Sequence, residues 1–208
     1  MMRIGVLVSG NGTNLEAILE ACRAGDLPAQ VVWVGSSRPG CPALDRAARY
    51  GVPSQALDPK SFPDRDTYER RLVQELSRMG PVDLVVLAGY LRIAGPILLR
   101  AYPRMINLHP SLLPALRGLG SIRRALAAGL AETGCTVHVV DAGLDTGPVL
   151  RQRRVPVVPD DTLESLERRI HDAEHALLIE TLRDLATGRL MPFSLQPRPH
   201  KRSADRGP

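Results

Sequence analysis

The chain has 208 residues, which suits one domain with at most a small appendage. Hydrophobic residues make up 44% of it and aromatic residues only 3%, a composition that favours helices packed on an aliphatic sheet over an all-β sandwich. The net charge is +5, but four basic residues against one acid in QPRPHKRSADRGP (196–208) contribute +3 of it, which leaves about +2 for the body. That balance suits a small anionic substrate without requiring a nucleic acid, and no stretch approaches the roughly 20 apolar residues that span a membrane.

Short apolar runs alternate with helical patterns along the first half of the chain. In chain order they predict a strand at 3–8, a helix at 14–25, a strand at 29–36, helices at 41–51 and 64–80, and a strand at 82–89. The first two helices end on Gly25 and Gly51, and the third on Gly80, where a left-handed residue commonly ends a helix. Asp66 and Glu69 resemble a capping box in the third helix.

The second half continues the same alternation. It predicts a strand at 104–108, a helix at 120–129, a strand at 135–140, an edge strand at 153–158 that contains proline, and a last helix from Asp161 to Thr187. We therefore expect a single α/β domain over residues 1–190, with a mostly parallel twisted sheet, helices on both faces and a Rossmann-like N-terminal half. Residues 191–208 are expected to form a flexible C-terminal tail.

Three polar loops follow predicted strands, at 9–14 (SGNGTN), at 106–114 (INLHPSLLP) and at 141–147 (DAGLDTG). Ligands of open parallel sheets bind beyond the C-terminal ends of the strands. We therefore expect the three loops to meet at one cleft.

The first loop favours an anion. Gly10 and Gly12 permit a tight turn, Thr13 or Asn14 can cap the next helix, and a helix N-terminus attracts negative charge. The loop lacks the GK[ST] of a P-loop and the third glycine of a dinucleotide motif, so a single phosphate is the expected ligand. A plain glycine-rich turn with a capping threonine is the alternative.

The other two loops carry a possible catalytic set. Asn107 and His109 are two residues apart on a strand and should share a face, while Asp145 lies between Gly143 and Gly147. An amide and an imidazolium can donate to a developing oxyanion, and a carboxylate can orient the imidazole, which suits acyl transfer. Apart from Ser111, the sequence places no Ser or Cys nucleophile beside His109, which favours direct attack by a substrate amine.

Histidines elsewhere have simpler interpretations. HDAEH, at residues 171–175, matches a zinc-peptidase pattern, but no acidic helix follows, so no metal is expected and Glu174 is predicted to face the cleft. His138 is expected to support the catalytic set from behind or to lie in the core. Cys22, Cys41 and Cys135 form no CxxC pair and are expected to be reduced thiols of a cytoplasmic protein.

The motifs VLVSGNGTNLEAIL, VVLAGYLRI, INLHPSLLP and TVHVVDAGLDTGPVL, in this order and spacing, resemble the phosphoribosylglycinamide formyltransferase family, the folate-dependent GAR transformylases of purine synthesis. The resemblance spans about residues 3–190. It implies that Asn107, His109 and Asp145 are catalytic. It also implies that the substrate glycinamide ribonucleotide contacts Gly12, Thr13, Asn14, Arg65 and Glu174, with its phosphate on the first three.

The resemblance further implies formyltetrahydrofolate as the formyl donor and no metal. The expected folate contacts are Leu91, Arg92, Ile93, Asn107, Asp141, Ala142, Gly143, Leu144 and Asp145. It also implies a cis peptide at Leu113–Pro114, two small-molecule substrates, no nucleic acid or membrane partner, and a monomer or homodimer.

One segment departs from the family. Gly120, Ser121 and Ile122 stand where many bacterial members carry a histidine-bearing stretch, and RGLGSIRRAL is somewhat more similar to methionyl-tRNA formyltransferase. A tRNA formyltransferase and a formyltetrahydrofolate hydrolase therefore stay as alternatives, although both are expected to need a further domain. The remaining alternative is a non-catalytic phosphate-binding α/β module.

Overall fold

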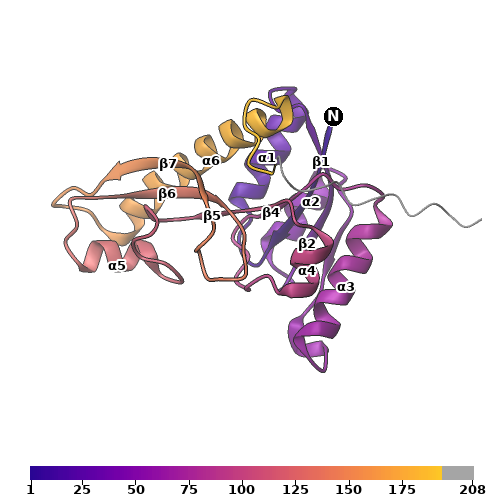
Figure 1. Ribbon diagram of the computed structural model, residues 1–208. Helices are drawn as coiled ribbons and strands as arrows, with labels where there is room; N and C mark the ends of the chain where they lie inside the picture. Colours follow the sequence, from indigo (N-terminus) through magenta and orange to yellow (C-terminus); the bar gives the residue numbers. More distant parts are fainter. Residues whose placement is uncertain (194–208) are drawn as a thin grey trace, which may run out of the picture.

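The computed structural model describes residues 1–193, so most of the predicted tail lies outside the described residues. A seven-stranded sheet organises the chain, with strand order β3-β2-β1-β4-β5-β6-β7 (Figure 1). The first five strands in this order run parallel, and β6 and β7 are antiparallel. The strands are β1 (Met2–Val8), β2 (Ala29–Ser36), β3 (Ser54–Ala56), β4 (Leu84–Leu87), β5 (Met105–His109), β6 (Glu132–Val139) and β7 (Val149–Pro156).

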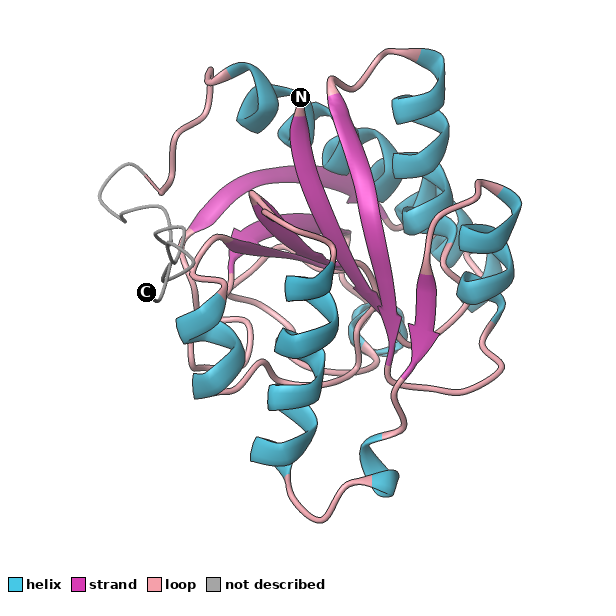
Figure 2. Cartoon of the chain, turned by 90° about the vertical axis from the view of Figure 1, so that its right-hand side faces the viewer, coloured by secondary structure: helices cyan, strands magenta, loops and turns pink. Residues whose placement is uncertain are grey.

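Helices cover both faces of the sheet (Figure 2). They are α1 (Thr13–Ala24), α2 (Pro42–Arg49), the 3-10 turn η1 (Pro59–Ser61), α3 (Arg65–Arg78), α4 (Pro96–Ala101), α5 (Ser121–Ala127) and α6 (Leu163–Thr187). Alternation along β1 shows the two sides: Val6 and Val8 pack with α1, α2 and α6, while Leu7 packs with α3 and α4. The predicted α/β class with a mostly parallel sheet is confirmed.

The local predictions need four corrections. The strand β3, the turn η1 and the helix α4 were not predicted, because three- to six-residue elements carry little periodicity. Strand β7 begins at Val149 and not at residue 153, since the charged side chains of an edge strand hide its alternation. Helix α3 is capped by Asp64 and not by Asp66: the Asp64 carboxylate accepts from the Thr67 N–H at 2.7 Å. Helix α6 begins at Leu163, after its cap Thr162, and not at Asp161.

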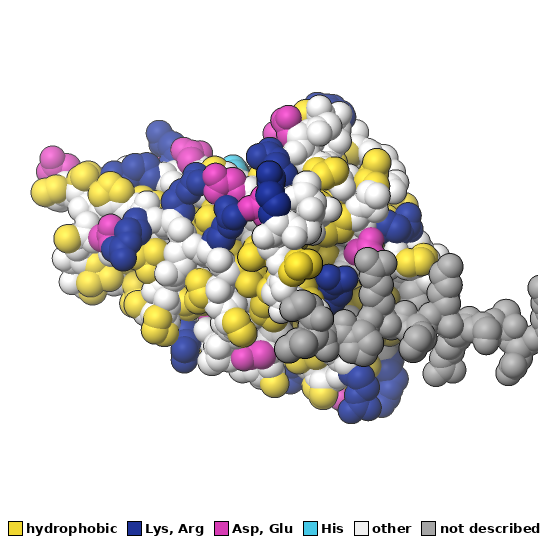
Figure 3. All heavy atoms as spheres, turned by 45° about the horizontal axis from the view of Figure 1, so that its top comes forward, with side chains coloured by type: hydrophobic (Ala, Val, Ile, Leu, Met, Phe, Trp, Pro, Cys, Tyr) yellow, Lys and Arg dark blue, Asp and Glu magenta, His cyan; other side chains and the backbone are white. Residues whose placement is uncertain are grey.

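Basic and acidic side chains lie close to one another on the surface. Arg and Lys side chains are interspersed with Asp and Glu on the face shown in Figure 3. Along β7, Arg151 pairs with Asp184, and Arg153 pairs with Glu180 at 3.0 Å. Among the described helices, none is long and apolar enough to cross a membrane.

The described chain ends at Phe193, inside the segment assigned to the tail. The Phe193 side chain is buried against the core on the α6 side of the sheet, and the Arg104 guanidinium lies 5.5 Å from its ring centre. The packed part of the chain therefore extends a few residues beyond the expected boundary at 190.

Candidate functional site

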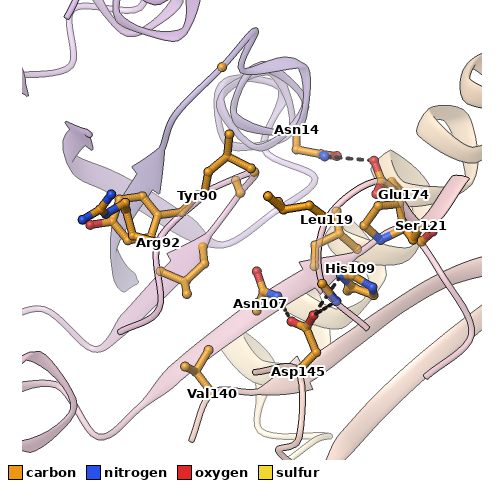
Figure 4. Close-up of a pocket in the computed structure, with 18 of the residues that line it drawn as sticks. Asn14, Tyr90, Arg92, Asn107, His109, Leu119, Ser121, Val140, Asp145 and Glu174 are labelled. Carbon is orange, nitrogen blue, oxygen red and sulfur yellow. Dashed lines mark hydrogen bonds and ion pairs between the residues drawn. The ribbon is translucent and has the colours of Figure 1, made fainter. Parts of the chain in front are cut away.

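One cavity of about 600 Å³ lies where the loops after β1, β4, β5 and β6 converge, with α6 along one side. Figure 4 shows Asn14 and Glu174 on one side of it, and His109, Asn107 and Asp145 on another. This is the position expected for a ligand in an open parallel sheet, beyond the C-terminal ends of the strands. Its volume suits a small molecule of substrate size.

The loop after β1 brings the N-terminus of α1 to the cavity. Gly12, Thr13 and Asn14 all line it, and the first N–H groups of a helix have no partner within the helix. The prediction that Thr13 or Asn14 caps the helix is wrong, because the cap is Gly12 in a left-handed conformation, with φ 75° and no side-chain cap. An ideal Cβ on Gly12 would lie 2.5 Å from the Ala43 Cβ of α2.

Asn14 and Glu174 join α1 to α6 beside this loop. The Asn14 amide donates to the Glu174 carboxylate at 3.1 Å, and the buried Asn14 Oδ1 has no hydrogen-bond partner among the described residues. Glu174 is 4% exposed, and burial raises its pKa to about 7, although the Asn14 hydrogen bond opposes the increase. The pair therefore offers an acceptor and a titratable carboxyl group to a ligand that carries N–H or O–H groups.

Glu174 should couple stability to pH. Its pKa is raised from 4.5 to about 7 in the folded chain, so the folded state holds this proton more tightly than the unfolded state. Its contribution is complete below pH 4.5 and is lost as the pH rises to about 7. We predict that wild type loses about 6–12 °C in Tm relative to Glu174→Gln over this range, measured by calorimetry.

The matched control for that measurement is Glu164→Gln, on the same helix but 86% exposed. Its Tm should follow wild type at every pH. A Tm difference between wild type and Glu174→Gln that stays constant from pH 4 to pH 8 would contradict the raised pKa.

Asn107, His109 and Asp145 come together at the centre of the cavity (Figure 4). The His109 Nδ1 lies 3.4 Å from one Asp145 carboxylate oxygen, and the Asn107 amide donates to the other at 3.3 Å. The two-residue spacing on β5 explains why Asn107 and His109 share a face, and the loop after β6 brings Asp145 to them.

His138 lies behind this set. Its Nδ1 donates to the Val139 carbonyl oxygen at 2.8 Å, so its Nε2 is left to accept from the Asn107 amide at 3.1 Å. Both hydrogens of the Asn107 amide are therefore used, one by His138 and one by Asp145. The Asn107 amide oxygen is turned away from Asp145 (Figure 4).

His109 is buried, and each ring nitrogen faces an oxygen. Its Nε2 lies 3.0 Å from the Leu116 carbonyl oxygen, and its Nδ1 faces Asp145. Burial lowers the pKa of His109 below its usual value, while the Leu116 carbonyl and the Asp145 carboxylate partly oppose the decrease. The ring is therefore mainly neutral at neutral pH but has both acceptors that an imidazolium would need.

Asp145 is held as a carboxylate by its surroundings. Burial alone would raise its pKa, but the nearby His138 ring, the Gly118 N–H at 2.8 Å and His109 lower it to about 2. Its backbone is left-handed, with φ 52°, within a tight loop. A Cβ on Gly143 would meet the Thr146 side chain, and one on Gly147 would meet the Val139 carbonyl, so both glycines are required by close contacts.

The far side of the cavity has an apolar rim. Its members are 48% to 75% exposed and come from three loops: Leu91, Ile93, Leu119 and Leu144. Such an apolar rim can pack against the flat face of an aromatic ring, while the polar centre beside it can bond to the polar groups of the same ligand. Arg92 and Gly143 also line the cavity.

Three predicted contacts lie elsewhere. Asp141 and Ala142 are not among the residues that line the cavity, and Asp141 instead holds its own loop by accepting from the Gly143 N–H at 3.0 Å. Arg65 does not line the cavity either: its guanidinium faces Glu69 and donates to the Ile93 carbonyl at 2.9 Å. The substrate contacts of all three stay predictions, and in the structure Asp141 and Arg65 bond to the loops that line the cavity.

The segment that departs from the family has structural roles. Gly120 starts α5 with φ 68°, and the buried Ser121 hydroxyl donates to the Pro110 carbonyl at 2.9 Å. Ile122 packs against α6 and β7. The Leu113–Pro114 peptide is cis, as the resemblance implied.

Some residues at the cavity were not singled out by the sequence. Leu119, Tyr90, Val140 and His171 line it, and although all four lie in segments that had been considered, none had been assigned a ligand contact. Apolar residues in loops give no signal of their own, because residue type alone does not separate an exposed ligand contact from core packing. Residues 1–193 contain no group of three or more His, Cys, Asp or Glu that could hold a metal.

Comparison with known proteins adds independent information. Residues 2–182 match the family model described as formyl transferase. Phosphoribosylglycinamide formyltransferase of Bacillus subtilis is 40% identical over 84% of this chain and 90% of that protein. The trifunctional purine biosynthetic protein adenosine-3 of Drosophila melanogaster is 43% identical over 89% of this chain, which spans only 14% of that protein. The crystal structure of glycinamide ribonucleotide transformylase 1 from Symbiobacterium toebii is 49% identical, with a TM-score of 0.88, over 91% of this chain and 90% of that chain.

Proposed function

The chain belongs to the formyl transferase family, and from this premise we propose that it transfers the formyl group of formyltetrahydrofolate to the primary amine of glycinamide ribonucleotide, in de novo purine (IMP) biosynthesis. One observation carries the proposal: a single cavity joins a helix N-terminus, the set of Asn107, His109 and Asp145, and an apolar rim. A phosphosugar and a folate can therefore approach the same reacting centre from opposite sides.

The ribonucleotide occupies the side of α1. Its phosphate accepts from the N–H groups at the start of the helix, around Gly12 and Thr13. The glycinamide end then lies near Asn14 and Glu174, where the unpartnered Asn14 Oδ1 accepts an N–H and the Glu174 carboxyl group contacts the amine. The pterin of the folate lies against Leu91 and the other apolar residues of the rim.

The amine attacks the formyl carbon, and the negative charge that develops on oxygen needs donors. The donors at the centre of the cavity are the amide of Asn107 and the Nε2–H of His109, which is then shared between the Leu116 carbonyl and the oxyanion. To reach the oxyanion, Asn107 gives up its weaker hydrogen bond, the 3.3 Å contact with Asp145, and keeps the 3.1 Å contact with His138. One such donor typically contributes about 100- to 1000-fold in rate.

Asp145 supplies the counter-charge for this step. Its carboxylate faces His109 at 3.4 Å, so it stabilises the imidazolium that forms as the ring takes part in proton transfer. The proton moves from the new ammonium group toward the leaving folate nitrogen, which adds about 100- to 10,000-fold. Ser111 is not a nucleophile in this scheme, because its hydroxyl is fully buried and donates to the Ala115 carbonyl at 2.6 Å.

The test supplies purified protein with formyltetrahydrofolate and one of three acceptors: glycinamide ribonucleotide, charged initiator tRNA or water. We expect rapid loss of the folate formyl group only with the ribonucleotide. The reaction is monitored through the absorbance of the released tetrahydrofolate. Formyl transfer to tRNA, or release to water at a comparable rate, would overturn the proposal in favour of the related enzymes. A protein that binds phosphate but reacts with no acceptor would be the non-catalytic module.

The cytoplasm as the place of this reaction, and a monomer or homodimer as its assembly, are parts of the same proposal. The substrates assigned here are both small molecules, and no nucleic acid or membrane is needed for the step.

A further inference from the structure

The loop between β5 and α5 supplies two backbone groups to the catalytic set. The Leu116 carbonyl faces the His109 Nε2 at 3.0 Å, and the Gly118 N–H donates to Asp145 at 2.8 Å. The loop is held in an unusual conformation, since Leu116 has φ 55° and Gly118 has φ 77°. A non-glycine residue with positive φ is maintained only where its surroundings fix it.

Arg124 fixes this conformation from outside the cavity. It lies in the last turn of α5, and its guanidinium donates to the Leu116 carbonyl at 2.8 Å and also to the Arg117 carbonyl. Among the described residues, Arg124 is the side chain other than His109 that bonds to the Leu116 carbonyl. Both bonds come from one guanidinium nitrogen, Nη2, so this single group ties the two neighbouring carbonyls together.

We propose that Arg124 is a positioning residue for formyl transfer: it fixes the Leu116 carbonyl, and the Leu116 carbonyl fixes the ring of His109. This inference rests on the proposed function for its kinetic consequence. Arg124 does not line the cavity and touches no reacting atom, so it acts through Leu116.

The consequence for His109 is a choice of tautomer. A neutral imidazole carries one N–H, and two oxygens compete for it: the Leu116 carbonyl at Nε2 and the Asp145 carboxylate at Nδ1. A fixed Leu116 carbonyl favours the Nε2–H form. Nδ1 is then the nitrogen that takes up a proton, beside the carboxylate that stabilises the resulting cation.

Three charged or titratable groups act on this ring. They are Asp145 from the loop after β6, His138 from β6 and Arg124 from α5, and burial, which has the largest effect, lowers the pKa of the ring. Asp145 favours the imidazolium, whereas His138 and Arg124 disfavour it. Removing the Arg124 charge therefore raises the pKa of His109, whereas loosening the Leu116 carbonyl lowers it. Because the two effects oppose each other, the tautomer of His109 reports its positioning more directly than its pKa does.

The experiment compares wild type with Arg124→Met, Arg124→Lys and the control Arg123→Met. Arg123 is the exposed neighbour on the same helix, and its loss changes the net charge by the same amount. Nitrogen-15 NMR of the imidazole rings reports the tautomer, with the His109 signals assigned by their loss in His109→Asn. Steady-state kinetics with formyltetrahydrofolate and glycinamide ribonucleotide give kcat and both KM values.

We expect a neutral His109 with Nε2–H in wild type and in Arg123→Met. In Arg124→Met the Nδ1–H form should rise, kcat should fall about tenfold and both KM values should stay within about twofold, because neither Arg124 nor Leu116 lines the cavity. Arg124→Lys should give intermediate values of both measurements.

An unchanged His109 tautomer in Arg124→Met would overturn the inference, as would equal loss of kcat in Arg123→Met. A wild type that shows the Nε2–H form and transfers no formyl group to the ribonucleotide would contradict the proposed function alone. In that case the NMR comparison still decides whether Arg124 positions His109.

Discussion

His109→Ala is expected to lower kcat by about 1,000- to 10,000-fold with a KM for glycinamide ribonucleotide close to wild type. The substitution removes an oxyanion donor and the group that carries the proton, while the residues at the α1 end of the cavity stay in place. His109 lies at the C-terminal end of β5, so the sheet pairing before it is retained. Asp145→Asn should lower kcat by about 100- to 1,000-fold, because an amide of the same shape cannot stabilise an imidazolium.

Asp145 also gives these variants a signature in stability. Its pKa is lowered from 3.8 to about 2 in the folded chain, so it stabilises the fold above about pH 4, and this contribution is lost as the pH falls to about 2. Wild type should therefore melt above Asp145→Asn at pH 7, and the two should converge in acid. The exposed Asp160→Asn is the matched control and should match wild type in kcat and in Tm.

Two results would count against the catalytic assignment. One is a rate near that of wild type in His109→Ala. The other is a loss of cooperative melting in both variants, which would attribute the lost activity to unfolding. Calorimetry of every variant at the assay pH separates these outcomes.

Gly12→Ala is expected to raise the KM for the ribonucleotide by about 10- to 100-fold and to leave the KM for the folate nearly unchanged. The sequence alone suggests that a Cβ here would obstruct the phosphate. The structure gives a different reason, because the Cβ would lie 2.5 Å from the Ala43 Cβ and 2.7 Å from its Cα. With φ at 75° as well, the substitution forces the loop away from α2 and moves the N–H groups that hold the phosphate.

Gly10→Ala is the matched control in the same loop. Gly10 also lines the cavity, but an ideal Cβ there meets no protein atom within 4 Å, so the loop should stay in place, the Tm should stay near wild type and the ribonucleotide KM should change less than in Gly12→Ala. Equal effects of the two substitutions would show that any side chain in the loop weakens binding, and would contradict the explanation that the contact with Ala43 displaces the loop. If Gly12→Ala raised the KM for the folate more than the KM for the ribonucleotide, the assignment of the phosphate to this loop would be wrong.

The long elements and the sheet class could be predicted from the sequence, because apolar runs rich in Val, Leu and Ile alternate along the chain with segments of amphipathic helical pattern. It also predicted which loops meet, since the C-terminal ends of parallel strands share one edge. The proximity of Asn107 to His109 follows from their spacing on a strand. Asp145 was placed with them because its loop also follows a predicted strand, although the order of the strands in the sheet was not predicted.

The remaining features depend on contacts that no local pattern encodes. Asn107 divides its amide hydrogens between His138 and Asp145, an arrangement set by the register of β5 against β6. The bond between Arg124 and Leu116 depends on a left-handed residue in a loop, and Leu116 gives no sequence signal for that conformation. Arg65 donates to the Ile93 carbonyl and does not line the cavity, and no local pattern predicts that contact.

The central claim is that the amine of a phosphosugar and the formyl group of a folate react directly within one cavity. The most direct test is a single turnover with excess protein and formyltetrahydrofolate labelled in its formyl group, quenched at successive times after glycinamide ribonucleotide is added. All label should pass from the folate to the ribonucleotide amine, with none on the protein at any time and no loss of label before the ribonucleotide arrives. Label bound to the precipitated protein, or a folate that loses its formyl group without the ribonucleotide, would contradict the account.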